Sequence, residues 1–257
     1  MVASQSLLMV TALSKNFGGH QAVRQVSFEL RSGAIAGLIG PNGAGKTTLF
    51  NCLTGFMRPA SGQILLDSVP IHGRSSSAAF AAGLARTFQI PRPFPAMSVL
   101  ENVMLAPRGQ QGEKFWANWF QPRQVDRQEA KVREDARYWL DFVGLSRLEN
   151  EPASVLSGGQ RKLLELARVM VAQPKLVLLD EPGAGVNPAL LDQIVDKIQI
   201  LNSQGTTFFI IEHNMDLVAN LCNPVMVMAQ GQLLMSGLAE EVLKDPRVVH
   251  AYLGNAE

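Results

Sequence analysis

The chain has 257 residues, 47% of them hydrophobic, which is enough for one domain with a substantial core. Its formal net charge of +1 excludes a general electrostatic attraction to nucleic acid, so no nucleic acid is expected as a partner. Two cysteines are too few for a disulfide framework, residues 1–9 lack the features of a signal peptide, and no stretch approaches the roughly 20 apolar residues that cross a bilayer. We therefore expect a chain that is soluble by itself and reaches a membrane only through a partner.

Strand-like runs dominate the first part of the chain. Apolar residues alternate with polar ones, or follow one another directly, over 7–13, 23–30, 34–39 and 63–66. A short segment over 47–53 has helical character. This part of the sequence predicts strands arranged around one helix.

The pattern changes in the middle of the chain. Three prolines between 90 and 95 exclude a helix interior, because proline lacks an amide donor and clashes with the preceding turn, so an extended connector is predicted. Helices are predicted over 99–105 and 127–143, the second ending at Gly144 as a C-cap. A polar stretch with a tryptophan pair, over 108–127, separates them.

The last part of the chain returns to alternating strands and helices. Strands are predicted over 176–179, 206–211, 225–229 and 232–236, and helices over 158–172 and 188–201. The last two strands flank Gln230 and Gly231, as in a hairpin. We interpret 1–257 as a single α/β domain with a nested helical segment over 83–160.

The segment 40–47 matches the pattern G-x-x-x-x-G-K-[ST] between a buried strand and a helix, which is the setting of a phosphate-binding loop. Its glycines let successive N–H groups face one anion, and the positive end of the helix dipole faces the same point. Lys46 adds a charge for the β- and γ-phosphates, and the Thr47 hydroxyl can ligate Mg²⁺. The nucleotide-binding residues predicted here are Asn42, Gly43, Ala44, Gly45, Lys46, Thr47 and Thr48.

Two carboxylates follow the apolar strand 176–179, at the sheet edge where open parallel sheets bind ligands. Asp180 is predicted to hold Mg²⁺ beside Thr47. Glu181 points to the opposite side of the strand because side chains alternate. It is predicted to polarise a water molecule for in-line attack on the γ-phosphate.

Ser157, Gly158, Gly159 and Gln160 begin the helix predicted over 158–172, where exposed backbone N–H groups make an anion site. With the two motifs above, this makes the whole chain resemble the ABC ATPase family. The resemblance implies a P-loop fold of the ABC ATPase type, with a mixed α/β sheet core, an antiparallel β subdomain and a nested helical subdomain. It also implies ATP hydrolysis with Mg²⁺, in a head-to-tail dimer in which this motif closes over the ATP of the second subunit.

The same resemblance assigns roles to five further residues. Gln89 matches the glutamine that reaches Mg²⁺ or the attacking water, and His213 matches the histidine that donates to the γ-phosphate. Asn187 ends the segment that contacts the other subunit, where the family pattern has aspartate. Phe17 occupies the position of the aromatic that stacks on adenine, with Val23 beside the base; an ordinary core phenylalanine is the alternative.

The motifs around the connector resemble the ATPase subunits of branched-chain and neutral amino acid importers. This resemblance implies a second ATPase subunit, identical or related, transmembrane permease subunits and, indirectly, a substrate-binding protein. It places the chain at the cytoplasmic face of the inner membrane, held there by the permeases. Phe94 and Met97 are candidates for the permease contact, with core packing as the alternative. Urea or amide importers, lipopolysaccharide exporters and a soluble ATPase without a membrane partner remain alternatives.

Overall fold

The computed structural model describes residues 6–87, 93–107 and 122–253. They form two compact units. The first unit contains the described residues within 1–89, 174–184 and 191–257, and the second those within 90–173 and 185–190. Among the described residues, no helix is both long and apolar enough to span a bilayer.

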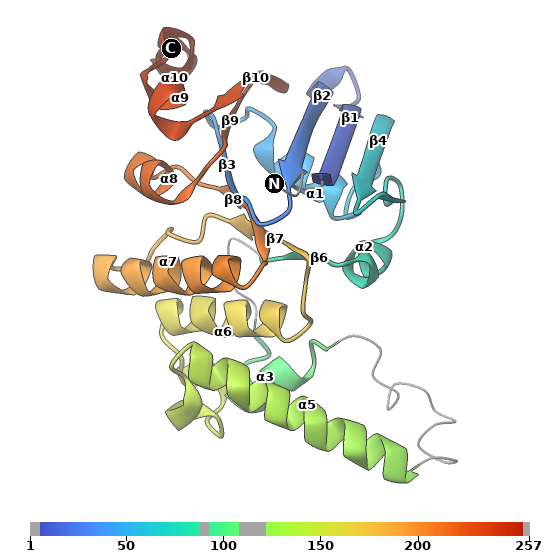
Figure 1. Cartoon of the computed structure of the whole chain (residues 1–257), viewed down its shortest axis with the longest axis vertical. Coiled ribbons are helices and arrows are strands. Elements are labelled where there is room, and N and C mark those ends of the chain that lie inside the picture. Colours follow the sequence, from blue (N-terminus) through green and yellow to red (C-terminus); the bar gives the residue numbers. More distant parts are fainter. Residues whose placement is uncertain (1–5, 88–92, 108–121, 254–257) are drawn as a thin grey trace, which may run out of the picture. The chain divides into compact units, whose positions relative to one another are not determined.

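A six-stranded sheet forms the centre of the first unit, with the strand order β10-β9-β3-β8-β7-β6 (Figure 1). All neighbouring strands are parallel except the β9–β10 hairpin. Its strands are β3 (Ile35–Ile39), β6 (Leu84–Arg86), β7 (Leu176–Asp180), β8 (Thr207–Ile211), β9 (Val225–Ala229) and β10 (Gln232–Gly237). Every residue of β7 and β8 is buried, as expected for central parallel strands.

An antiparallel sheet of order β2-β1-β4-β5 completes the strands of this unit. Its members are β1 (Ser6–Phe17), β2 (His20–Arg31), β4 (Ser61–Leu66) and β5 (Val69–Pro70). β1 and β2 are 12 residues long, which exceeds the predicted runs because their polar ends carry no apolar pattern. The hairpin turn at Gln230 and Gly231 is confirmed, and both residues have the positive φ that a tight hairpin needs.

The core of the first unit joins both sheets to helix α1 (Lys46–Leu53). The Phe209 ring on β8 lies 5.5 Å from the Phe28 ring on β2 and 5.1 Å from the Phe50 ring on α1, measured between centroids. Cys52 and Cys222 are both free and buried. The phosphate-loop helix therefore starts from a packed core, which holds its first turn in place.

The remaining helices of the first unit are α2 (Ser76–Ala82), α8 (Met215–Leu221), α9 (Ala239–Lys244) and α10 (Pro246–Leu253). Helix α7 (Pro188–Ser203) starts in the second unit and continues in the first. The predicted nested segment began at residue 83, but Leu84–Arg86 pairs with β7 in the central sheet, so the second unit starts later. Three residues are too few to show a strand pattern, and only the pairing with β7 defines β6.

The second unit is helical, with α3 (Val99–Met104), α5 (Pro122–Phe142) and α6 (Gly158–Met170). Two short 3₁₀ turns, η2 (Ser146–Leu148) and η3 (Ala153–Val155), lie between α5 and α6. All three helices were predicted, and Gly144 follows α5 with a φ of 75°, as a C-cap should. A capping box of Ser98 and Glu101 starts α3.

Candidate active site

The loop between β3 and α1 requires glycine at two positions for space as well as for backbone conformation. A Cβ on Gly40 would lie 2.1 Å from the Met228 carbonyl oxygen, and one on Gly45 would lie 2.2 Å from the Ala22 carbonyl oxygen. Gly45 has a φ of 99°, and it is the N-cap of α1. The loop therefore packs closely against the backbones of β2 and β9, and these contacts fix the path of the chain into α1.

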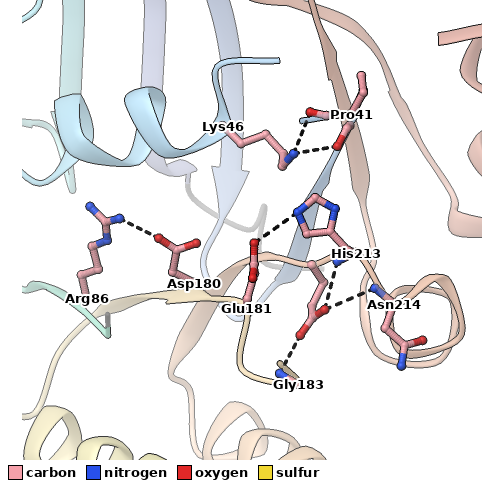
Figure 2. Close-up of polar contacts among 10 residues, drawn as sticks. Pro41, Lys46, Arg86, Asp180, Glu181, Gly183, His213 and Asn214 are labelled. Atoms are coloured by element: carbon pink, nitrogen blue, oxygen red, sulfur yellow. Dashed lines mark hydrogen bonds and ion pairs between the residues drawn. The ribbon is translucent and has the colours of Figure 1, made fainter. Parts of the chain in front are cut away.

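Lys46, the first residue of α1, is buried and turns back onto the loop (Figure 2). Its Nζ donates hydrogen bonds to the carbonyl oxygens of Gly40, at 2.6 Å, and Pro41, at 3.1 Å. Burial lowers the pKa of Lys46, while the nearby carboxylates of Glu181 and Asp180 act in the opposite direction. The ammonium group thus lies close to both carboxylates and is held by its own loop.

A pocket of about 370 Å³ opens over this loop, within the first unit. It is lined by Phe17, His20, Ala22, Asn42, Gly43, Ala44, Gly45, Lys46, Thr47, Thr48, Glu181 and His213. The structure therefore brings together all seven loop residues, Phe17, Glu181 and His213, which the sequence placed in four separate segments. His20 and Ala22 were not predicted, because neither residue type marks a ligand site by itself.

The two predicted adenine contacts differ in their placement. The side chain of Phe17 is 48% exposed and lines the pocket, which excludes a core role; the Lys15 ammonium lies 5.3 Å from its ring centroid. Val23 is a correction: it is fully buried in the hydrophobic core, and Ala22 lines the pocket in its place. Ala22 and Val23 are adjacent buried residues on β2, and the sequence does not indicate which of the two reaches the pocket.

Asp180, the last residue of β7, forms an ion pair with Arg86 of β6 (Figure 2). The Arg86 Nη2 to Asp180 Oδ2 distance is 2.7 Å, and the Asp180 side chain is only 6% exposed. Arg86 also donates to the Asn51 side chain on α1. The sequence did not indicate this pair, because it depends on the parallel pairing of β6 with β7.

Glu181 and His213 face each other across the ends of β7 and β8 (Figure 2). His213 Nε2 lies 3.2 Å from Glu181 Oε1, and the Glu181 N–H donates to the Ile211 carbonyl oxygen at 2.9 Å. Glu181 has a φ of 51°, a left-handed conformation that costs a residue other than glycine about 1–2 kcal/mol. Its neighbours must therefore hold it in place.

Glu212 is a buried residue next to this pair that sequence reasoning missed. Its Oε1 accepts the Gly183 N–H at 2.7 Å, and its Oε2 accepts the N–H groups of His213, at 3.0 Å, and Asn214, at 3.3 Å. A charged residue directly after the four apolar residues that end β8 is the only signal in the sequence, and it does not reveal these partners.

The serine-glycine-glycine motif lies in the second unit, at the start of α6. Ser157 Oγ accepts the Gln160 N–H at 3.3 Å, and the Gln160 side chain accepts the Ser157 N–H at 2.9 Å. Ser157 and Gly158 are exposed, whereas Gly159 is buried. A Cβ on Gly159 would lie 1.7 Å from Leu190 Cδ2, so a side chain there would displace that of Leu190.

Two other predicted features have different outcomes. Asn187, which stands where the family pattern has aspartate, accepts the Leu190 N–H at 2.9 Å and caps α7 as an aspartate would. Gln89 lies outside the described residues, as does the tryptophan pair of the polar stretch.

Known proteins with similar sequences were found over almost the whole chain. The sequence matches the ABC transporter family over residues 23–184. It is 41% identical over 254 residues to the "High-affinity branched-chain amino acid transport ATP-binding protein LivG" of Salmonella typhimurium, with 98% of this chain and 100% of that protein covered. It is 39% identical, with the same coverage, to the corresponding protein BraF of Pseudomonas aeruginosa.

Two solved structures resemble the fold closely. A nucleotide-free ATP-binding cassette from an ABC transporter has a TM-score of 0.84 and 35% identity, covering 96% of this chain and 98% of that chain. The ADP conformation of MJ1267, an ATP-binding cassette of an ABC transporter, has a TM-score of 0.84 and 34% identity, covering 98% and 100%. Fold and sequence agree on the class, an ATP-binding cassette. The chain belongs to the ABC transporter family, and the predicted fold class and ATPase activity are confirmed.

Proposed function

We propose that this chain is the ATP-hydrolysing subunit of a membrane transporter that imports branched-chain or neutral amino acids. The pocket over the phosphate loop supports the hydrolysis, since it combines the loop, Glu181 and His213. The chain matches relatives over their full lengths, and the names of these relatives specify branched-chain amino acid transport. This match supports the proposed cargo. The chain works at the cytoplasmic face of the inner membrane, attached through permease subunits.

In this proposal ATP binds with its phosphates on the loop 42–48 and its adenine against Phe17. Lys46 exchanges its two loop carbonyl partners for phosphate oxygens, which are stronger acceptors because they are charged. The exposed Phe17 ring needs no polar group to stack on a base. The bound nucleotide then lies over Glu181 and His213.

Glu181 accepts a proton from the attacking water as the bond to the γ-phosphorus forms and the bond to the β,γ-bridging oxygen breaks. His213 lies 3.2 Å from Glu181 and can donate to the γ-phosphate or keep the water in line. Both side chains come from the carboxyl ends of parallel strands, where open sheets bind ligands. No covalent intermediate with the protein is needed.

The donor set at the strand end suits Mg²⁺, which prefers oxygen ligands and substrate phosphates. The Thr47 hydroxyl lines the pocket, and Asp180 is a nearly buried carboxylate close to Lys46. We assign both as ligands, directly or through water, with Gln89 as a third. When bound, Mg²⁺ neutralises charge on the phosphates.

We also propose that two such subunits close head to tail, so that Ser157, Gly158 and Gly159 of one cover the γ-phosphate on the loop of the other. The exposure of Ser157 and Gly158 supports this role, since a turn buried in its own chain could not reach a neighbour. The partner subunit is a second copy or a related chain. ATP-driven closure then pulls on the permeases.

Reconstitution in proteoliposomes tests the cargo. The chain is combined with candidate permeases and a candidate binding protein, and ATP hydrolysis is followed with leucine, urea or no substrate. We expect leucine with the binding protein to stimulate hydrolysis. If urea stimulates hydrolysis and leucine does not, the chain serves a urea or amide importer instead. If no permease copurifies with the chain, a soluble ATPase is favoured.

A further inference from the structure

The Glu212 carboxylate lies between the two segments that carry Glu181 and His213. The dashed lines that end at Gly183 and Asn214 in Figure 2 converge on this carboxylate. Glu212 is 3% exposed, and the three hydrogen-bond partners given above are backbone N–H groups. A buried carboxylate is unfavourable unless it accepts such bonds, and bonds to a charged acceptor are about twice as strong as neutral ones.

The three donors belong to the two catalytic segments. Gly183 follows Glu181 by two residues, in a turn closed by the Ala184 N–H bond to the Glu181 carbonyl oxygen at 3.1 Å. His213 and Asn214 come directly after Glu212, the first residue beyond β8, and Asn214 caps helix α8. One side chain therefore fixes the backbone on both sides of the 3.2 Å contact between Glu181 and His213.

The conformation of Glu181 explains why such a connection is needed. Its left-handed backbone is unfavourable and persists only where surrounding contacts hold it. The Ile211 carbonyl holds the Glu181 N–H, and Glu212 holds the turn that follows. A Cβ at Gly183 would lie 2.9 Å from Glu212 Oε1, so a side chain there would displace the carboxylate.

We propose that Glu212 is a positioning residue for ATP hydrolysis, which holds Glu181 and His213 in register without touching the nucleotide. This inference rests on the proposed function. Glu212 is not among the residues that line the nucleotide pocket, so its loss leaves the phosphate loop intact. A displacement of about 1 Å in a catalytic group can reduce turnover roughly 100-fold.

The first variant is Glu212→Gln, which keeps size but not charge. Whichever way the amide is turned, its NH₂ group faces at least one backbone N–H, so one of the two connections is lost. We expect kcat for ATP hydrolysis to fall about 10- to 100-fold, while the Kd for ATP changes less than about threefold. Glu29→Gln, at an exposed position on β2, is the matched control and keeps the wild-type kcat.

The second variant, Gly183→Ala, disturbs the same contact from the other side. It keeps Glu212 and all pocket residues, and Gly183 has no positive φ that alanine would avoid. We expect a similar fall in kcat, and the double variant should be no worse than the more affected single variant, because both changes break one contact. If Glu212→Gln does not fold, as judged by its thermal transition, Gly183→Ala alone decides.

Three outcomes overturn the inference: a folded Glu212→Gln protein with kcat within twofold of the wild type, a loss of ATP affinity that matches the loss of kcat, or multiplicative effects in the double variant. A purely structural role would lower the melting temperature and leave kcat unchanged. If the wild-type protein itself hydrolyses no ATP in this assay, the proposed function fails, and Glu212 is not the cause.

Discussion

Lys46 shows how a single side chain serves both the shape of the loop and the binding of a ligand. Its buried ammonium donates to two carbonyl oxygens of its own loop and lies near two carboxylates. The loop therefore keeps its shape through a charge-assisted contact that phosphates can replace. Substitution of this residue affects both the loop and the ligand.

Lys46→Ala is expected to weaken ATP binding about 10- to 150-fold, which is the effect of losing a charged hydrogen-bond donor that contributes about 1.5–3 kcal/mol. Isothermal titration calorimetry measures the Kd directly. Lys131→Ala, at an exposed position on α5, is the control and should bind ATP as the wild type does. An unchanged Kd for Lys46→Ala would contradict the role of the phosphate loop.

Glu181→Gln separates binding from hydrolysis. The amide cannot accept the proton of the attacking water, so we expect kcat to fall at least about 100-fold. ATP should still bind, and the closed dimer should accumulate because hydrolysis no longer reopens it. Size-exclusion chromatography with ATP shows the dimer, and a phosphate-release assay shows kcat. Glu240→Gln, exposed on α9, is the control; normal hydrolysis by Glu181→Gln would remove this residue from its assigned role.

At the level of elements, α3 fixes the described part of the connector through one buried side chain. Asn102 is fully buried; its Oδ1 accepts the Phe94 N–H at 2.8 Å, and its Nδ2 donates to the carbonyl oxygens of Phe94, at 3.0 Å, and Ser98, at 2.9 Å. Phe94 itself is 51% exposed and Met97 is half-buried, so neither is a fully buried core residue. Asn102 therefore presents Phe94 outward, where the permease contact is predicted.

Asn102→Ala leaves the Phe94 N–H without its partner inside the protein, whereas the carbonyl oxygens of Phe94 and Ser98 still accept the backbone N–H groups of Met97 and Asn102. We expect the free energy of unfolding to fall by about 1–3 kcal/mol, since each unsatisfied buried polar group costs about that much. Urea denaturation measures the change, and Asn220→Ala, exposed on α8, should leave stability almost unaltered. A loss below about 0.5 kcal/mol would mean that the connector is held by other contacts.

The elements also show what the sequence can predict. The loop 40–47, the two carboxylates at the end of β7 and the turn at Ser157 are local patterns, in which spacing and residue type carry the chemistry. The ion pair of Arg86 with Asp180 and the contacts of Glu212 join segments far apart in the chain. They depend on the register of β6, β7 and β8, which no single segment encodes.

At the scale of the whole molecule, the proposed catalysis needs two subunits. Each provides one phosphate loop in its first unit and one serine-glycine-glycine turn in its second. The turn is exposed at Ser157 and Gly158, at a helix start, which suits a phosphate supplied by a neighbour. Activity should therefore depend on association.

The specific ATPase activity is expected to rise with protein concentration while dimers are scarce, and to level off when they predominate. Dilution over about three orders of magnitude, with saturating ATP, covers both regimes for a micromolar dimer. Ser157→Ala removes a contact proposed between the subunits, so its activity should be lower and should level off only at a higher protein concentration. A specific activity that is constant at every dilution would indicate a monomeric enzyme.

A Cβ at Gly159 would lie 1.7 Å from Leu190 Cδ2, and this short distance has a genetic consequence. Gly159→Ala must displace the Leu190 side chain and should lower the activity, and a second change that shortens the opposing side chain, Leu190→Ala, should act as its suppressor. A larger residue at position 159 is then tolerated only with a smaller residue at position 190. A screen for revertants of Gly159→Ala should therefore recover smaller residues at 190. Recovery of revertants only at sites remote from α7 would show that the collision is relieved by backbone movement instead.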